Sequence, residues 1–176
     1  MVARVLTALA WVLLSLSYHG HATALTSTDQ QSETLRALIE KLEDSHYVDR
    51  RYNDAMSREH LNSYLERLDP SHLYFTARDI ADFDRLATVL DDQGRKGNVT
   101  ASFEIFNRYE AIAGARLDEV IDTMDVRVGG FDFEVDEFIA SDPTERDWAV
   151  STAELDDRWR KRIKNQVLGL RLADKA

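Results

Sequence analysis

The sequence predicts a mainly α-helical fold in which about five amphipathic helices pack as an irregular helical bundle, with a short extended segment near residues 131–136. Apolar residues recur at the i, i+3, i+4 and i+7 spacing of a helix face through most of the chain. Residues that favour helix N-caps precede these stretches. Only 7 glycines and 2 prolines occur in 176 residues, and 44% of the residues are hydrophobic, so the composition suits one domain with a core.

The first predicted helix spans residues 31–44. Its apolar residues share one face and its charged residues lie opposite, as expected for a helix that packs against a core. Asp29 or Ser32 can cap its first turn, because a side-chain oxygen there accepts a hydrogen bond from a free backbone N–H. The apolar stripe consists of Leu35, Leu38, Ile39 and Leu42.

The second predicted helix begins after the N-cap residue Asn53 and ends at Leu68. Asp69-Pro70 stops it, since proline disfavours the α conformation in the residue before it. The apolar triplet Leu73-Tyr74-Phe75 follows at once and is expected to be buried. The stretch therefore predicts a structural corner that fixes how two helices meet. The stripe of this helix comprises Met56, His60, Leu61, Tyr64, Leu65 and Leu68.

A third helix is predicted to start at Thr76, which forms a capping box with Asp79. Residues 91–97 then form a polar break, and the fourth and longest helix starts at Asn98 or Thr100 and reaches about Asp125. The third stripe consists of Ile80, Phe83, Leu86, Ala87 and Leu90. The fourth consists of Phe103, Phe106, Ile112, Ala113, Leu117, Val120, Ile121 and Met124.

Residues 131–136 alternate apolar and acidic side chains, which predicts an extended segment with one face buried and carboxylates outside. Ser151 and Glu154 form a capping box that opens the last helix. Its apolar face carries Leu155, Trp159, Ile163, Val167 and Leu170, and its basic face carries Arg158, Arg160, Lys161, Arg162 and Lys164. In so acidic a chain, we expect that basic face to match carboxylates within the molecule.

The N-terminus is typical of an export signal. Met1 to Arg4 is a short basic start, residues 5–18 are largely apolar, and Ala22-Thr23-Ala24 supplies a small-x-small cleavage pattern. The apolar run of about 14 residues is shorter than the roughly 20 that a membrane-spanning helix needs. The sequence therefore predicts a signal peptide over residues 1–24, cleaved after Ala24, and a single helical domain over residues 25–176. An uncleaved anchor is the alternative.

Charge and composition exclude several classes of function. The net charge is −10, so the chain is repelled by nucleic acid and by anionic membrane surfaces. The chain has no cysteine, which excludes disulfides, thiol catalysis and Cys-ligated zinc. We expect no nucleic-acid partner and no stable membrane insertion once the signal is removed.

No pattern in the sequence predicts a reactive centre. It contains no nucleophile elbow, phosphate-binding loop or dinucleotide fingerprint. His46, His60 and His72 have spacings unlike a compact metal motif and are expected at helix ends or on the surface. The aromatic residues at helical spacing are expected in the core. We therefore predict no catalytic residue, no cofactor-binding residue and no metal site.

Six segments occur in the order and at the approximate spacing of one known family, over about Leu35 to Ala173. They are His46-Tyr47-Val48-Asp49, Tyr64 to Phe75, Asp79-Ile80 with Phe83, Phe103 to Tyr109, Phe131-Asp132-Phe133 with Val135-Asp136-Glu137, and Trp159 to Asn165. Together they resemble the N-terminal region of the tail-specific proteases, the periplasmic carboxy-terminal processing peptidases of the S41 serine protease family.

The resemblance implies an N-terminal helical domain, or a truncated fragment, of a serine endopeptidase, in a region that helps to frame the substrate-receiving cavity. Its implied partners are the remainder of such a protease or a lipoprotein adaptor, and its implied location is the periplasm. The family's PDZ domain and serine–lysine dyad have no counterpart in this sequence. Ser71 and Lys161 match the dyad by residue type only, so we expect the chain to be non-catalytic, with a scaffolding or partner-docking role.

Two other interpretations remain open from the sequence. One is a stand-alone periplasmic helical binding protein that acts as an adaptor or decoy for a full-length protease. The other is an enzyme with an unrecognised site, which would require a pocket with convergent polar groups.

Overall fold

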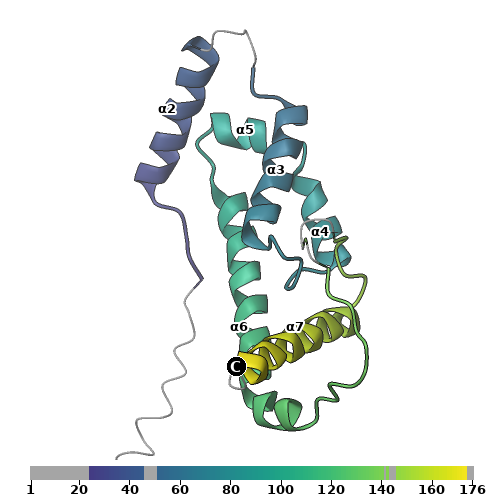
Figure 1. The fold of residues 1–176 in the computed structure, drawn as a ribbon. Helices are drawn as coiled ribbons and strands as arrows, with labels where there is room; N and C mark the ends of the chain where they lie inside the picture. Colours follow the sequence, from purple (N-terminus) through teal and green to yellow (C-terminus); the bar gives the residue numbers. More distant parts are fainter. Residues whose placement is uncertain (1–23, 46–50, 141, 143–145, 174–176) are drawn as a thin grey trace, which may run out of the picture.

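The computed structural model describes residues 24–45, 51–140, 142 and 146–173, and most of these residues are helical (Figure 1). The expected mainly α fold is confirmed. The predicted signal peptide lies outside the described residues, apart from Ala24. The elements are α2 (Asp29–Ser45), α3 (Asp54–Leu68), α4 (Ala77–Phe83), the 3₁₀ turn η1 (Asp84–Leu86), α5 (Leu90–Arg95), α6 (Thr100–Gly129) and α7 (Thr152–Ala173).

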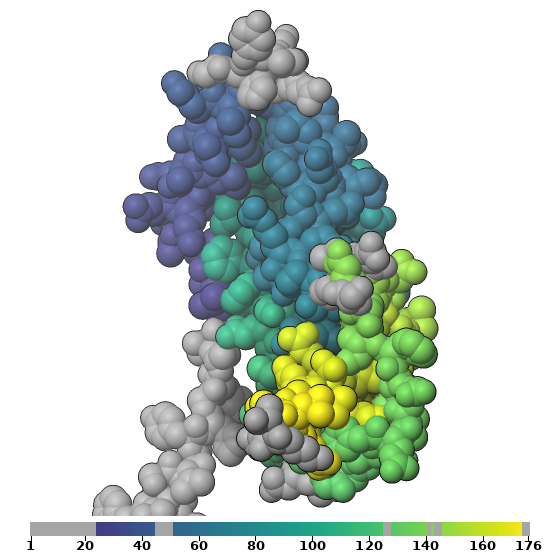
Figure 2. Space-filling model, viewed as in Figure 1, coloured from purple at the N-terminus to yellow at the C-terminus, as the bar shows by residue number. Residues whose placement is uncertain are grey.

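The long helix α6 runs through the middle of the bundle, and the other helices lie beside it (Figure 1). The short elements α3, α4 and α5 lie at its N-terminal half, and α7 crosses its C-terminal half. Helix α2 packs mainly against α5 and forms a separate ridge on one flank in the space-filling view (Figure 2). The segment after α6 runs back along α7 towards α4, where Ala149 forms a single parallel bridge with Thr76.

Two predicted helix starts are confirmed at atomic detail. Asn53 accepts a hydrogen bond from the backbone N–H of Met56, and Thr76 with Asp79 forms a complete capping box. These caps satisfy N–H groups that have no partner within the first turn of a helix.

The expected cap of the first helix was wrong. Thr28, rather than Asp29 or Ser32, caps α2: its Oγ1 accepts from the N–H of Gln31, and Gln31 Oε1 accepts from the N–H of Thr28 at 2.9 Å. This is a capping box with glutamine in the fourth position.

The third predicted helix is broken in the structure. Helix α4 ends at Phe83, η1 follows, and α5 forms over Leu90–Arg95, where a polar break was expected. Asp91 explains the difference, because it is buried and exchanges hydrogen bonds with Ser57 of α3: its N–H donates to Ser57 Oγ at 2.9 Å, and Ser57 Oγ donates to its carboxylate at 3.2 Å. A contact between distant residues stabilises a turn that local polarity did not predict.

The segment expected to be extended near residues 131–136 is irregular. Phe131 and Phe133 are half-buried and meet edge to face with ring centroids 6.1 Å apart, but Val135 is 53% exposed. No strand is assigned to residues 131–140. The alternating sequence therefore places the rings of Phe131 and Phe133 inward. It does not form a strand, because a strand needs a neighbouring strand to pair with its backbone N–H and C=O groups.

The corner after α3 joins two clusters of buried apolar side chains. Phe75 belongs to a cluster among α3, α4, η1 and α6, and Leu73 belongs to a second cluster between α6 and α7. The first contains Leu61, Leu65, Phe75, Phe83, Leu86, Ala87, Ala101 and Ile105, and the second contains Leu73, Val120, Trp159 and Ile163. The predicted burial of Leu73 and Phe75 is thus confirmed, and the corner couples both halves of the bundle.

Candidate functional site

The corner is organised by the carboxylate of Asp69. This residue is fully buried. Its Oδ1 accepts from the N–H of Leu73 at 2.9 Å, and its Oδ2 accepts from the N–H groups of Tyr74 and Phe75 at 2.8 and 2.9 Å. A buried carboxylate is tolerated when backbone donors surround it. Asp69 therefore does more than end a helix, because it shapes the turn that follows.

His72 was expected at a helix end or on the surface; it lies in the turn that follows the end of α3, and it is buried. It is 4% exposed and has a φ of 47°, in the left-handed region. Its Nδ1 contacts the carbonyl of Arg146, its Nε2 lies 3.0 Å from Glu66, and its ring stacks on Trp148 at 3.6 Å between centroids. The partners at 146 and 148 are distant in sequence, so local spacing could not show that this histidine is buried.

Two side chains of α7 hold the carbonyl groups of the corner. Arg158 donates to the carbonyls of His72 and Asp147, both at 2.9 Å, and Trp159 Nε1 donates to the carbonyl of Leu73 at 2.9 Å. The corner, the segment before α7 and α7 itself are thereby fixed together. These contacts describe a structural hub, in which the polar atoms are engaged in holding the fold.

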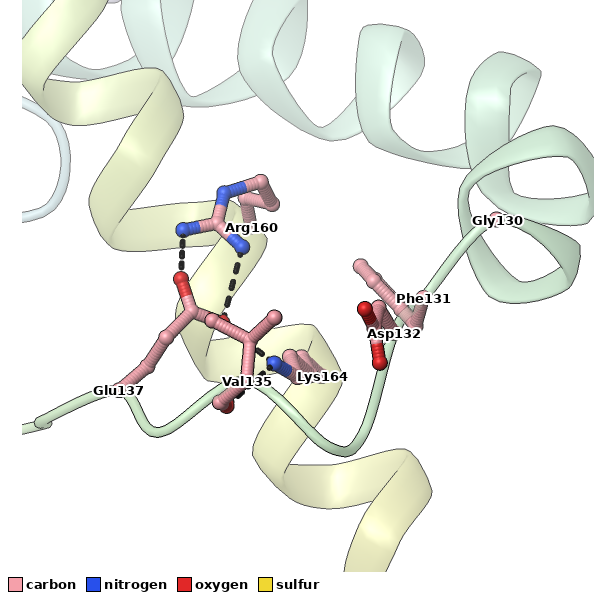
Figure 3. A pocket seen from close by; sticks show the side chains of 7 residues that line it. All are labelled: Gly130, Phe131, Asp132, Val135, Glu137, Arg160 and Lys164. Atoms are coloured by element: carbon pink, nitrogen blue, oxygen red, sulfur yellow. Dashed lines mark hydrogen bonds and ion pairs between the residues drawn. The ribbon is translucent and has the colours of Figure 1, made fainter.

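The basic face of α7 has the internal charge match that was expected (Figure 3). Arg160 forms a two-pronged ion pair with Glu137 and a second pair with Asp157 at 2.7 Å. Lys164 contacts Glu137 at 2.5 Å and the carbonyl of Val135 at 3.3 Å. Hydrogen bonds from Arg160 and then from Lys164 lower the pKa of Glu137 from 4.5 to about 2.

A hollow of about 390 Å³ opens beside these ion pairs. Its cationic groups already face Glu137, so a ligand anion would have to compete with a carboxylate held by three hydrogen bonds. The arrangement serves to fasten the segment after α6 onto α7. The lining residues are Gly130, Phe131, Asp132, Val135, Glu137, Arg160 and Lys164 (Figure 3).

Ser71 and Lys161, which match the family's dyad by residue type, both lie at positions that serve the fold. Ser71 is half-buried in the corner turn, and Lys161 pairs with Asp157 one helical turn earlier at 2.7 Å. His60 lies on the surface of α3 with Nδ1 3.0 Å from the hydroxyl of Tyr52, and His46 lies outside the described residues. Among the described residues there is no group of three or more metal-ligating side chains.

The most distinctive surface feature is apolar rather than polar. Leu38 and Leu42, which were expected to face the core, are 53% and 51% exposed and line a groove of about 300 Å³ between α2 and α3. Leu170 was also expected on a buried face and is 68% exposed. Helical spacing located these residues on one face but could not show what covers that face.

A second apolar set lies where the segment after α6 meets the last turns of α7. Val135, Ile139 and Leu168 line one hollow of about 180 Å³. These three exposed residues, Val135, Ile139 and Leu168, are what we call the α7 apolar surface. None of the helices that the structure describes is both long and apolar enough to cross a membrane.

Comparison with known proteins identifies the family. A sequence profile described as "Tail specific protease N-terminal domain" matches residues 38–176. The chain is also 30% identical over 157 residues to the protein named "Tail-specific protease" of Haemophilus influenzae. That alignment covers 85% of this chain and 21% of the Haemophilus protein, so the chain spans about a fifth of the length of this relative. The chain therefore belongs to the tail-specific protease family, in which it corresponds to the N-terminal domain.

Proposed function

We propose that this domain is a non-catalytic docking module of a periplasmic tail-specific protease. It is exported by a signal peptide cleaved after Ala24 and binds the polypeptide that forms the rest of such an enzyme. Family membership supports the kind of partner, because the Haemophilus relative has 79% of its length outside the aligned region (100 minus 21). The placement of Ser71 and Lys161 in a structural turn and an ion pair supports the absence of catalysis.

The α7 apolar surface is the observation that carries this proposal. Val135, Ile139 and Leu168 are 53%, 42% and 37% exposed and line one hollow together. Single exposed apolar residues are ordinary, but a group that lines a shared hollow marks an interaction site. The occupant that we propose is the remainder of a tail-specific protease, which would bury these side chains against its own apolar residues.

The test is co-expression of this chain with a tail-specific protease polypeptide from which the matching N-terminal domain has been deleted. We expect the two to copurify, and we expect Val135→Glu together with Leu168→Glu to weaken the complex by about tenfold or more, since charge would be buried at the contact. Val150→Glu is the matched control, because Val150 is 80% exposed and lies before α7.

Two results would overturn the proposal. One is a failure to copurify when both polypeptides are folded. The other is cleavage, by this chain alone, of a reporter peptide with an apolar C-terminus. Binding to an intact protease instead of the deleted one would favour the adaptor or decoy interpretation. Cell fractionation checks the periplasmic location separately.

A further inference from the structure

The main chain of Leu25 is paired with a side chain of α6. The N–H of Leu25 donates to Asn107 Oδ1 at 2.8 Å, and Asn107 Nδ2 donates to the carbonyl of Leu25 at 2.8 Å. A carboxamide offers one acceptor and one donor side by side, so it can replace the pair of hydrogen bonds that a neighbouring strand residue would make. Asn107 therefore holds the backbone of residue 25, whatever its side chain.

This pairing is one of several polar contacts that position α2, among them a hydrogen bond from Arg36 to the carbonyl of Lys96 at 3.2 Å. Only three residues separate Leu25 from the start of α2, and Thr28 caps that helix. At the other end, Arg95 of α5 contacts Glu43 of α2 at 3.3 Å. Ile39 of α2 is buried, but hollows of about 220 and 300 Å³ border α2. Because this packing is incomplete, the polar contacts matter for the position of α2.

Two independent observations meet at the Ala24–Leu25 peptide bond. The small-x-small pattern marks this bond for cleavage, and the residue that follows it is the one that Asn107 holds. We propose that Asn107 is a docking site for the processed N-terminus, so that removal of residues 1–24 places the α-ammonium of Leu25 on Asn107 Oδ1. This proposal rests on the export proposed above.

The chemistry is a hydrolysis by an export-coupled signal peptidase. Water adds across the Ala24–Leu25 bond, which breaks; Ala24 leaves with a carboxylate, and the nitrogen of Leu25 becomes an α-amino group that takes up a proton. The neutral N–H donor to Asn107 Oδ1 is thereby replaced by a charged donor. Charge-assisted hydrogen bonds are about twice as strong as neutral ones. Processing therefore tightens the tie that leads into α2.

The first experiment exports the full chain from a Gram-negative host and purifies the product. We expect mass analysis to show that the product begins at Leu25. Hydrogen exchange of residues 29–44 then reports on the docking of α2. Asn107→Ala should speed this exchange roughly fivefold, the effect of losing about one net hydrogen bond. Asn165→Ala is the matched control, because Asn165 is exposed on α7, and it should leave the exchange unchanged.

The second experiment tests the charge. In Asn107→Asp the carboxylate can accept from an α-ammonium but cannot donate to the carbonyl of Leu25. We expect slow exchange of α2 in this variant while the α-amino group is free. Selective acetylation near neutral pH, where lysines stay protonated, should make α2 of the Asn107→Asp variant exchange faster, because a neutral N–H then replaces the charged donor to the carboxylate. The parent protein, whose carboxamide still pairs with an acetylated N–H, should change less.

The proposal is overturned if the product begins at another residue, if Asn107→Ala leaves exchange unchanged, or if Asn107→Asp is indifferent to acetylation. Each of these results leaves the copurification test of the α7 apolar surface unaffected. Conversely, a failed copurification leaves the N-terminal residue and the exchange of α2 to be measured as before.

Discussion

At the scale of single residues, Asp69 has the largest predicted effect on stability. Asp69→Ala removes the acceptor of three backbone N–H groups and leaves a cavity in a fully buried site. We expect a loss of about 2–4 kcal/mol in the free energy of unfolding, measured by urea denaturation. Asp69→Asn keeps one oxygen acceptor and should lose less. Equal stability of Asp69→Ala and the parent would show that the corner does not depend on this carboxylate.

His72 provides a second prediction at this scale. Its left-handed φ favours glycine, whereas its ring contacts favour histidine. We expect His72→Gly to destabilise the fold by roughly 1–3 kcal/mol, because the loss of the stacked ring and of the contacts to Glu66 and Arg146 outweighs the relief of backbone strain. Thermal unfolding measures the net change in stability. Near-UV circular dichroism, to which Trp148 contributes, reports the loss of the stacked ring. A more stable His72→Gly variant would mean that strain dominates.

At the scale of elements, the attachment of the segment after α6 to α7 should depend on acid pH. The pKa of Glu137 is lowered from 4.5 to about 2 by Arg160 and then Lys164. The ion pairs therefore contribute fully above about pH 4.5, and their contribution is lost as the pH falls through about 2. We expect the stability difference between the parent and Glu137→Gln to be constant near neutral pH and to shrink over this window. A difference that is the same at pH 2 and pH 7 would contradict this.

The approach of α2 to α5 gives a prediction for a glycine. Gly97 has a φ of 72°, and a Cβ built there would lie 2.5 Å from the backbone carbonyl oxygen of Ser32 in α2. Gly97→Ala should therefore cost about 1–2 kcal/mol in backbone strain and also push α2 away. We expect faster hydrogen exchange in residues 29–44. Gly114→Ala is the control, because nothing lies within 4 Å of a Cβ at that position of α6.

The elements differ in how far the sequence determines them. Asn53 and Thr76 cap helices through local hydrogen bonds, so the starts of α3 and α4 could be predicted from residue type and spacing. The turn of α5 depends on Asp91 meeting Ser57, and burial of His72 depends on Trp148; neither contact has a local signal. The α7 apolar surface had no signal in the sequence, because Leu168 lies off the predicted stripe and meets Val135 and Ile139 only through the packing of the elements.

At the scale of the whole molecule, the two apolar clusters meet at the corner, whereas α2 joins neither of them through the residues that define them. The bundle of α3, α4, α6 and α7 should therefore unfold as one cooperative unit, and α2 should open earlier. Proteins open in units whose free energies follow the buried apolar contacts of each unit.

Native-state hydrogen exchange in increasing urea tests this order. We expect the amides of residues 35–42 in α2 to exchange with a free energy below that of global unfolding, and the amides around Leu61 and Ile105 to reach the global value. Phe83→Ala should lower the global value while the opening of α2 changes little, because Phe83 lies in the cluster among α3, α4, η1 and α6 and lines neither hollow that borders α2. Coincident free energies for α2 and for the bundle would show instead that α2 is part of the same cooperative unit, and that its bordering hollows do not weaken its attachment.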